Sequence, residues 1–178
     1  AAVPQVVCAT ESGASGAQVI DGSLKFDRTG SLNYLNRTPS SAGNRQAWSW
    51  SGWVKKTTST SDREVLFSGG STANDTDWLE FGYDNANFYA VSNTIAVTSS
   101  NVFRDYSAWQ NIVVTYNGAQ LTFYSNGIQF HSGARTGNLG INGQYLHTIG
   151  KSALTNVSRY FEGYLADVYF IDGQVLGP

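Results

Sequence analysis

The sequence predicts an all-β protein, an antiparallel sandwich or barrel of about a dozen short strands. The strongest evidence is in residues 109–131, where apolar and polar side chains alternate in three strand-like runs. Asn-Gly pairs at 117–118 and 126–127 separate these runs, and Asn-Gly accepts the positive φ angles of tight hairpin turns. No segment carries a sustained helical period between suitable caps, so we expect no helix.

The expected strands follow the chain in order, each bounded by a turn or a polar loop. Residues 36–46 and 71–77 are expected loops, because small and polar residues fill them. The run at 160–171 is apolar on both alternating faces, which is typical of a well-packed strand. Besides the meander at 109–131, the strands are expected at 23–27, 32–34, 48–55, 64–68, 78–83, 87–91, 94–98, 145–150 and 160–171.

The chain divides into an N-terminal arm and one domain. Residues 1–22 are small, weakly patterned and rich in Gly and Ser in their middle, which favours a linker or an arm that docks on a neighbour. Residues 3–7 are an alternative edge strand. Residues 23–178 are expected to fold as one domain, since a chain of this length can bury a core without metal or disulfide support.

Composition excludes some function classes. Charged residues make up 13% of the chain, the formal net charge is -2 and no basic run occurs, so nothing favours nucleic acid as a partner. Cys8 is the only cysteine, so the chain forms no intrachain disulfide. No apolar run is long enough to insert into a membrane. Met is absent, from which we expect a processed product or a domain excised from a longer chain.

Several segments, in the right order, resemble laminin-G-like, concanavalin A-like jelly rolls. Residues 23–27 (SLKFD) and 48–55 (WSWSGWVK) resemble the opening strands of that family. Residues 109–118 (WQNIVVTYNG) match its W-x-x-V/I-x-V-T-Y-D/N-G pattern, and residues 121–127 (LTFYSNG) match the L-x-L/F-Y-x-D/N-G pattern that follows. Residues 161–171 (FEGYLADVYFI) match its closing strand.

The resemblance spans residues 23–173 and implies a β-sandwich jelly roll with one convex and one concave sheet. It also implies ligand binding, often to sugars and sometimes through calcium, at the concave face or the rim loops. The closing segment 163–174 (GYLADVYFIDGQ) is most similar to versions in fibre and appendage proteins of marine bacteriophages and related viruses. That likeness implies a place on the virion surface, with neighbouring virion subunits as partners and with room for a homo-oligomer.

Glycoside hydrolysis is the enzymatic alternative, and it needs two carboxyl groups about 5 Å apart for retention or up to roughly 9 Å for inversion. The glucanase relatives carry Glu-x-Asp-x-x-Glu on one strand, and this chain lacks that pattern. In the nearest run, Asp77 and Glu80 are three residues apart, so in a strand they point to opposite faces. We therefore expect no catalytic residues.

Two acidic segments are candidates for calcium, which prefers several carboxylate, amide and carbonyl oxygens. Asp75 and Asp77 lie in one loop, and Asp84 opens a turn at the other end of the following strand. The length of that strand separates the two segments, so only one of them could join another rim loop. The alternative is ordinary turn chemistry, in which Asn and Asp bond their own backbone.

Outward aromatic rings are the candidates for stacking on a sugar. Trp78, Tyr89 and Tyr124 alternate out of phase with their apolar neighbours, so we expect them to face away from the core unless a loop or a subunit covers them. Asn85 and Asn87, in the turn before Tyr89, complete the expected ligand-binding set. The aromatic residues expected in the core are Trp48, Trp50, Trp109, Phe123 and Phe161.

The sequence thus favours a non-catalytic binding module that recognises a cell-surface glycan or receptor as part of a viral fibre or surface appendage. The alternative is a structural or decoration domain that docks on neighbouring virion proteins, which the low charge and the arm would suit. A glycoside hydrolase is the least favoured hypothesis.

Overall fold

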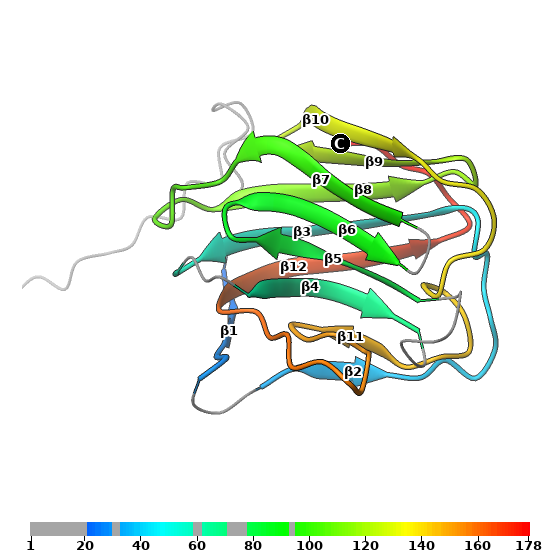
Figure 1. The fold of residues 1–178 in the computed structure, drawn as a ribbon, viewed down its shortest axis with the longest axis horizontal. Coiled ribbons are helices and arrows are strands. Elements are labelled where there is room, and N and C mark those ends of the chain that lie inside the picture. The colour runs from blue at the N-terminus through cyan, green and yellow to red at the C-terminus, as the bar shows by residue number, and fades with distance from the viewer. Residues whose placement is uncertain (1–20, 30–32, 59–61, 71–77, 93–94) are drawn as a thin grey trace, which may run out of the picture.

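The structure is a computed structural model that describes residues 21–29, 33–58, 62–70, 78–92 and 95–178. These residues form twelve strands and no helix, stacked as two antiparallel six-stranded sheets (Figure 1). No helix long and apolar enough to cross a membrane occurs among them. The predicted all-β sandwich of about a dozen strands is confirmed.

The two sheets are named A and B. Sheet A contains, in spatial order, β1 (Leu24–Phe26), β12 (Gly163–Asp172), β3 (Trp48–Lys56), β8 (Gln110–Tyr116), β9 (Gln120–Ser125) and β10 (Ile128–Ala134). Sheet B contains β2 (Leu35–Arg37), β11 (His147–Ile149), β4 (Arg63–Gly69), β5 (Leu79–Asp84), β6 (Asn87–Ser92) and β7 (Ile95–Val102). The position of β2 corrects the sequence prediction, because this strand lies partly in the segment at 36–46 that was expected to be a loop.

The predicted meander is confirmed as β8, β9 and β10, which are neighbours in sheet A. Asn126 and Gly127 have φ angles of 49° and 81°, as an Asn-Gly hairpin turn requires. At the first Asn-Gly pair only Gly118 has a positive φ, of 83°. There the Asn117 side chain accepts hydrogen bonds from the backbone N–H groups that follow, so Asn117 closes the turn with its side chain.

Large aromatic side chains fill the space between the sheets. Four of the five aromatic residues expected in the core are buried there: Trp48, Trp50, Phe123 and Phe161. The expectation for Trp109 is wrong, because its side chain is only half-buried and its ring contacts that of Tyr164 at 6.4 Å between centroids. The parity of Trp109 is opposite to that of the buried Ile112, which explains why it lies outside the core.

The neighbours of β12 change along its length, and this change opens one edge of the sandwich. Strand β1 pairs only with residues 163–165, whereas β3 pairs with β12 as far as Asp172. A bulge between Ala166 and Tyr169, where Asp167 has a φ of 48°, separates the two halves. Beyond the bulge the described residues supply no second strand neighbour for β12. The end of the core there faces the β2–β11 pair of sheet B.

Candidate ligand-binding groove

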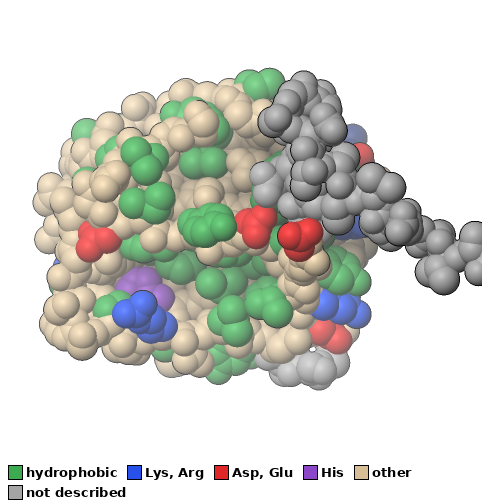
Figure 2. Space-filling model, turned by 180° about the vertical axis from the view of Figure 1, so that it is seen from behind, with side chains coloured by type: hydrophobic (Ala, Val, Ile, Leu, Met, Phe, Trp, Pro, Cys, Tyr) green, Lys and Arg blue, Asp and Glu red, His purple; other side chains and the backbone are tan. Residues whose placement is uncertain are grey.

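A groove of about 630 Å³ lies at this edge, between the second half of β12 in sheet A and strands β2, β11 and β4 in sheet B. Seen from behind in Figure 2, it is a hollow with hydrophobic side chains on its floor, beside a histidine and a basic side chain. Residues 39–43 form part of its rim. The side chains that define it are those of Arg37, Phe67, Asn142, His147, Phe170 and Asp172.

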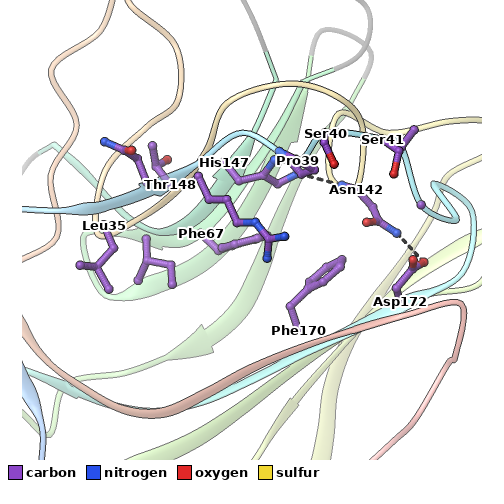
Figure 3. Close-up of a pocket in the computed structure, with 15 residues that line it drawn as sticks. Leu35, Pro39, Ser40, Ser41, Phe67, Asn142, His147, Thr148, Phe170 and Asp172 are labelled. Atoms are coloured by element: carbon purple, nitrogen blue, oxygen red, sulfur yellow. Dashed lines mark hydrogen bonds between the residues drawn. The ribbon is translucent and has the colours of Figure 1, made fainter.

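Two phenyl rings form the floor of the groove (Figure 3). Phe67 from β4 and Phe170 from β12 have ring centroids 5.7 Å apart and an interplanar angle of 26°. Leu35 and Ile149 add aliphatic surface beside them. Because both rings also pack against the core, the floor is a fixed apolar surface to which both sheets contribute.

The polar rim is organised around Asp172, where β12 ends. Its Oδ1 accepts hydrogen bonds from the backbone N–H of Asn44 at 2.8 Å and from Asn142 Nδ2 at 2.6 Å. Asn142 Nδ2 also donates to the Asn44 carbonyl, and the Gly43 N–H donates to the Asn142 carbonyl. Gly43 leaves no room for a side chain, since a Cβ there would lie 2.2 Å from Asp172 Oδ2. Three distant segments are thereby held in one rim.

His147 supports the rim as a neutral side chain. The Asn142 N–H donates to Nε2 at 2.8 Å, so Nε2 carries no proton, and Nδ1–H donates to the Tyr145 carbonyl at 2.9 Å. Burial lowers the pKa of His147 below its ordinary value of 6.5, and the nearby positive charge of Arg37 lowers it further. The imidazole is therefore a structural acceptor for the 142–147 turn.

Arg37 is the one cation among the described residues that line the groove. It lies directly opposite His147 in the β2–β11 ladder, and it is exposed. No carboxylate or carbonyl of the described residues pairs with its guanidinium. By contrast, Arg63 and Arg159 each hold a carboxylate on sheet B.

The groove offers complementary polar groups beside its apolar floor. Arg37 supplies donors. Asp172 supplies a carboxylate oxygen, on the far side of the floor from Leu35 and Thr148 (Figure 3). Nowhere in the described ranges do three or more His, Cys, Asp or Glu side chains gather in a way that could hold a metal ion. The arrangement suits a small polar ligand with one apolar face.

The Asp84 turn, expected to bind ligand or calcium, lies far from the groove. Asp84 Oδ2 forms an ion pair with Arg63 Nε at 3.3 Å. The Asn85 carbonyl accepts a hydrogen bond from Lys56 Nζ, at the end of β3 opposite to the Asp172 pairing. With about 3.3 Å per strand residue, the length of β3 corresponds to about 25 Å.

The structure describes Asn87 of the predicted site residues, but not the two acidic loop residues Asp75 and Asp77. Asn87 Nδ2 donates to the carbonyls of Ser99 and Asn101, so this side-chain amide links the start of β6 to β7. Asp75 and Asp77 lie outside the described residues, and their calcium role stays a prediction. The ligand-binding roles of Asn85 and Asn87 also stay predictions.

Trp78 and Tyr89 lie outside the cluster between the sheets, as their parity predicted, but both are buried. Trp78 is 7% exposed and packs against Gly70, whereas Tyr89 is 1% exposed. The Tyr89 hydroxyl donates to Glu80, and the Arg63 guanidinium covers its ring at 4.9 Å from the centroid. Both rings are therefore covered in this structure, and their ligand-binding roles stay predictions.

Segment 151–160 is connected to Tyr89 through Glu80. From this segment, the Ser152 hydroxyl donates to Glu80 Oε2 at 2.6 Å, and Arg159 pairs with Glu80 Oε1. The Ala153 N–H also donates to the Ser68 hydroxyl. The segment therefore lies across sheet B at β4 and β5. Sequence parity gives the face of a strand, but not the loop that covers it.

Tyr124 is half-buried on β9, next to the C-terminal segment. It pairs with Val113 and Gln129 of the flanking strands. Its hydroxyl lies about 4 Å from the position that a Cβ on Gly177 would take. Of the three predicted stacking residues, Tyr124 alone retains substantial exposure, and its ligand role stays a prediction.

Comparison with known families gives one match. The model of the concanavalin A-like lectin/glucanases superfamily matches residues 7–176. No curated protein sequence is significantly similar to this chain.

Solved structures share the fold at low sequence identity. The LG1-3 region of the laminin alpha2 chain is 15% identical with a TM-score of 0.65, covering 91% of this chain and 34% of that chain. The CBM40 of the Ruminococcus gnavus IT-sialidase is 13% identical with a TM-score of 0.58, covering 80% and 93%. Domain 4 of AbnA, an extracellular arabinanase from Geobacillus stearothermophilus, is 16% identical with a TM-score of 0.58, covering 76% and 64%. The chain thus spans less than two thirds of two of these proteins.

Proposed function

Because this chain belongs to the concanavalin A-like lectin/glucanases superfamily, we propose that it is a non-catalytic glycan-binding module whose ligand lies in the groove between β12 and β2. The observation that carries this proposal is the pairing of an apolar aromatic floor, Phe67 and Phe170, with a polar rim. Sugars have this same division, since their C–H faces are apolar and their hydroxyl edges donate and accept hydrogen bonds.

The carboxylate inventory of the groove supports a non-catalytic role. Asp172 is the one carboxylate among the described residues that line it. Glycoside hydrolysis by the common mechanisms needs a second carboxyl group within roughly 9 Å of the first. Oδ1 of Asp172 already accepts two hydrogen bonds from the rim, so this carboxylate holds the rim together.

The similar structures support a glycan as the class of ligand. The CBM40 has been solved bound to alpha2,3 sialyllactose, and domain 4 of AbnA in complex with arabinotriose. Both bind sugars on the sandwich fold that this chain shares. The same fold hosts many functions, so the proposal of a glycan ligand depends on the residues of the groove.

The same proposal places the module on a viral fibre or appendage at the virion surface, where a cell-surface glycan or receptor would be its partner. Its support is the resemblance of the closing segment 163–174 to such proteins. Immunogold labelling of purified virions with an antibody against this chain tests it. Labelled fibres are expected, and virions that contain no trace of the chain by mass spectrometry would contradict the viral assignment.

A blocked groove tests the binding function. Ser41 is exposed on the rim, so Ser41→Trp places a large side chain over the opening with little effect on the core. On a glycan array, the wild-type chain should bind at least one glycan, and Ser41→Trp should weaken that binding about tenfold or more. Ser100→Trp, exposed on β7, is the matched control. Equal binding by all three proteins would place the ligand elsewhere, and no binding to any glycan would contradict the function.

An exposed apolar surface favours a second candidate function, that of a domain docked on a neighbouring virion subunit or on another copy of the chain. Tyr169 on β12 is 59% exposed, and Val175 and Leu176 in the C-terminal segment are also exposed. If this surface docks, sedimentation should show a self-associated or partner-bound species that Tyr169→Ser weakens. A monomer at high concentration that also fails to bind the neighbouring subunits would remove this candidate.

A further inference from the structure

The guanidinium of Arg37 is the feature of the groove that its apolar floor does not explain. An exposed arginine usually contributes little to stability, but this one lines a groove. In that groove Asn142 donates to Asp172, and His147 accepts the Asn142 N–H. No described acidic side chain pairs with it. A guanidinium presents five donors in a planar fork, which matches the two oxygens of a carboxylate.

The residue opposite Arg37 neither neutralises this positive charge nor adds to it. His147 faces Arg37 across the β2–β11 ladder, and its Nε2 accepts the Asn142 N–H, so the imidazole is neutral. A neutral imidazole neither repels an anion nor adds a second positive charge. The groove therefore has one cationic position, set by the register between β2 and β11.

The remaining charge of the groove limits how much negative charge a ligand can carry. Asp172 lies on the far side of the floor from Leu35 and Thr148 (Figure 3). With Arg37 and Asp172 as its two charged groups, the described lining is close to neutral. A polysulfated or polyphosphorylated chain would bring repulsion from Asp172, whereas a single carboxylate at Arg37 would not.

The floor sets the size of the unit that carries the carboxylate. The open apolar surface beside the cationic position is small, because Phe67 is only 7% exposed and Phe170 is partly buried. Leu35 and Ile149 extend it. Oδ2 of Asp172 has no partner among the described residues, so it can accept a sugar hydroxyl. A sugar ring with a carboxylate at one edge and hydroxyls at the other would match the Arg37 guanidinium, the apolar floor and Asp172 Oδ2 together.

We propose that the groove recognises an acidic sugar, a sialic or uronic acid residue, whose carboxylate is held by Arg37 and whose apolar face lies on Phe67 and Phe170. This inference rests on the proposed glycan-binding function and names the ligand class of the same site. Arg37 is then the residue that determines specificity for charged over neutral glycans.

Isothermal titration of the whole chain with matched ligands tests the inference. The probes are 3′-sialyllactose and trigalacturonate, each beside its methyl ester, with lactose as a neutral glycan. An acid form should bind, and its ester should bind about ten- to a hundredfold more weakly, because esterification removes the charge that Arg37 contacts. Whichever acid binds identifies the source of the carboxylate.

Variants assign the effect to one side chain. Arg37→Ala should weaken binding of the acid about ten- to a hundredfold and leave binding of the ester unchanged. Arg37→Lys should recover part of the loss, since a lysine keeps the charge but not the planar fork. Arg104→Ala, which removes an exposed arginine on the segment between β7 and β8, is the matched control. Thermal unfolding of each variant establishes that it is folded.

The outcomes separate this inference from the function on which it rests. Equal binding of acid and ester, binding of neutral glycans alone, or full binding by a folded Arg37→Ala would each overturn recognition of a carboxylate and leave glycan binding intact. Failure of every glycan, acidic or neutral, would overturn both.

Discussion

His147 holds the groove rim with both of its ring nitrogens. Nε2 accepts the Asn142 N–H and Nδ1–H donates to the Tyr145 carbonyl. Protonation of Nε2 would remove the acceptor and place a charge beside Arg37. At this scale, one proton determines whether the 142–147 turn stays in place.

The pH dependence of stability tests this role of His147. Because burial lowers the folded-state pKa of His147 below 6.5, its contribution to stability is complete above about pH 6.5. The contribution is lost as the pH falls from there toward the folded-state pKa. Thermal unfolding between pH 7.5 and 5.5 should show a falling melting temperature, and His147→Gln should flatten the slope. His131→Gln is the control, and an unchanged slope in His147→Gln would contradict the role.

Glu80 is a buried carboxylate whose three partners come from β6 and from segment 151–160. It is 0% exposed and accepts from Tyr89, Ser152 and Arg159. Glu80→Ala should lower the free energy of unfolding by about 3 kcal/mol, near the low end for a broken buried pair, because Arg159 is 26% exposed and can reach water.

The control for Glu80 is the exposed ion pair between Arg63 and Asp84. Their side chains are 30% and 37% exposed, so Asp84→Ala should cost less than about 1 kcal/mol. Urea unfolding of both variants makes the comparison. Equal costs would show that segment 151–160 is not pinned through Glu80.

At the scale of elements, the β9–β10 hairpin depends on backbone conformation more than on contacts. Gly127 has a φ of 81°, and a Cβ there would meet no atom within 4 Å. The glycine is therefore needed for its left-handed conformation and not for space.

Replacing this glycine measures the cost of the turn. Gly127→Ala should destabilise the protein by about 1 kcal/mol, the penalty of a left-handed non-glycine residue. Gly22→Ala is the matched control, since its Cβ also meets nothing and its φ lies outside the left-handed region. Equal melting temperatures for the two variants would mean that the hairpin relaxes into another turn.

Element boundaries also determine where the groove lies. Strand β1 covers three residues of β12, and the bulge at Asp167 turns the remainder away from it. The short β2 and β11 strands form the facing wall. The groove is the gap that these short strands leave at the edge of a longer sheet.

At the scale of the whole molecule, the two charged groups of the groove are a side chain from each sheet, Arg37 and Asp172. Neither needs a metal ion to hold its place, because Asp172 is fixed by the rim amides and Arg37 by its strand. We therefore expect the groove to act separately from the calcium loop predicted at Asp75 and Asp77, which lie outside the described residues.

Removal of calcium tests that separation. Glycan binding in the groove should be unchanged by a chelator, since the described lining offers a single carboxylate. The array or the titration, repeated with calcium and with EDTA, makes the measurement, and Asp77→Asn is the companion variant. Binding that EDTA abolishes and that Asp77→Asn also loses would make the calcium loop part of the ligand site.

Most strands of this protein follow from local patterns in its sequence, with β2 as an exception. Alternation and Asn-Gly turns act within a few residues, so residues 109–131 predicted β8, β9 and β10, and parity predicted the burial of Trp48, Trp50 and Phe123. The same local signals placed Tyr89 off the core face, which is correct.

The tertiary structure alone decided which faces stay open and which distant residues meet. Segment 151–160 and Tyr89 both bond to the buried Glu80, and no sequence pattern near Tyr89 predicts this. Arg37 lies in a segment that looked like a loop, and Asn142 and Asp172 come from other parts of the chain. Their meeting depends on how two sheets stack and where short strands end, which is a sum of many long-range contacts. The strands are therefore encoded locally, whereas the candidate site exists only once the sandwich has closed.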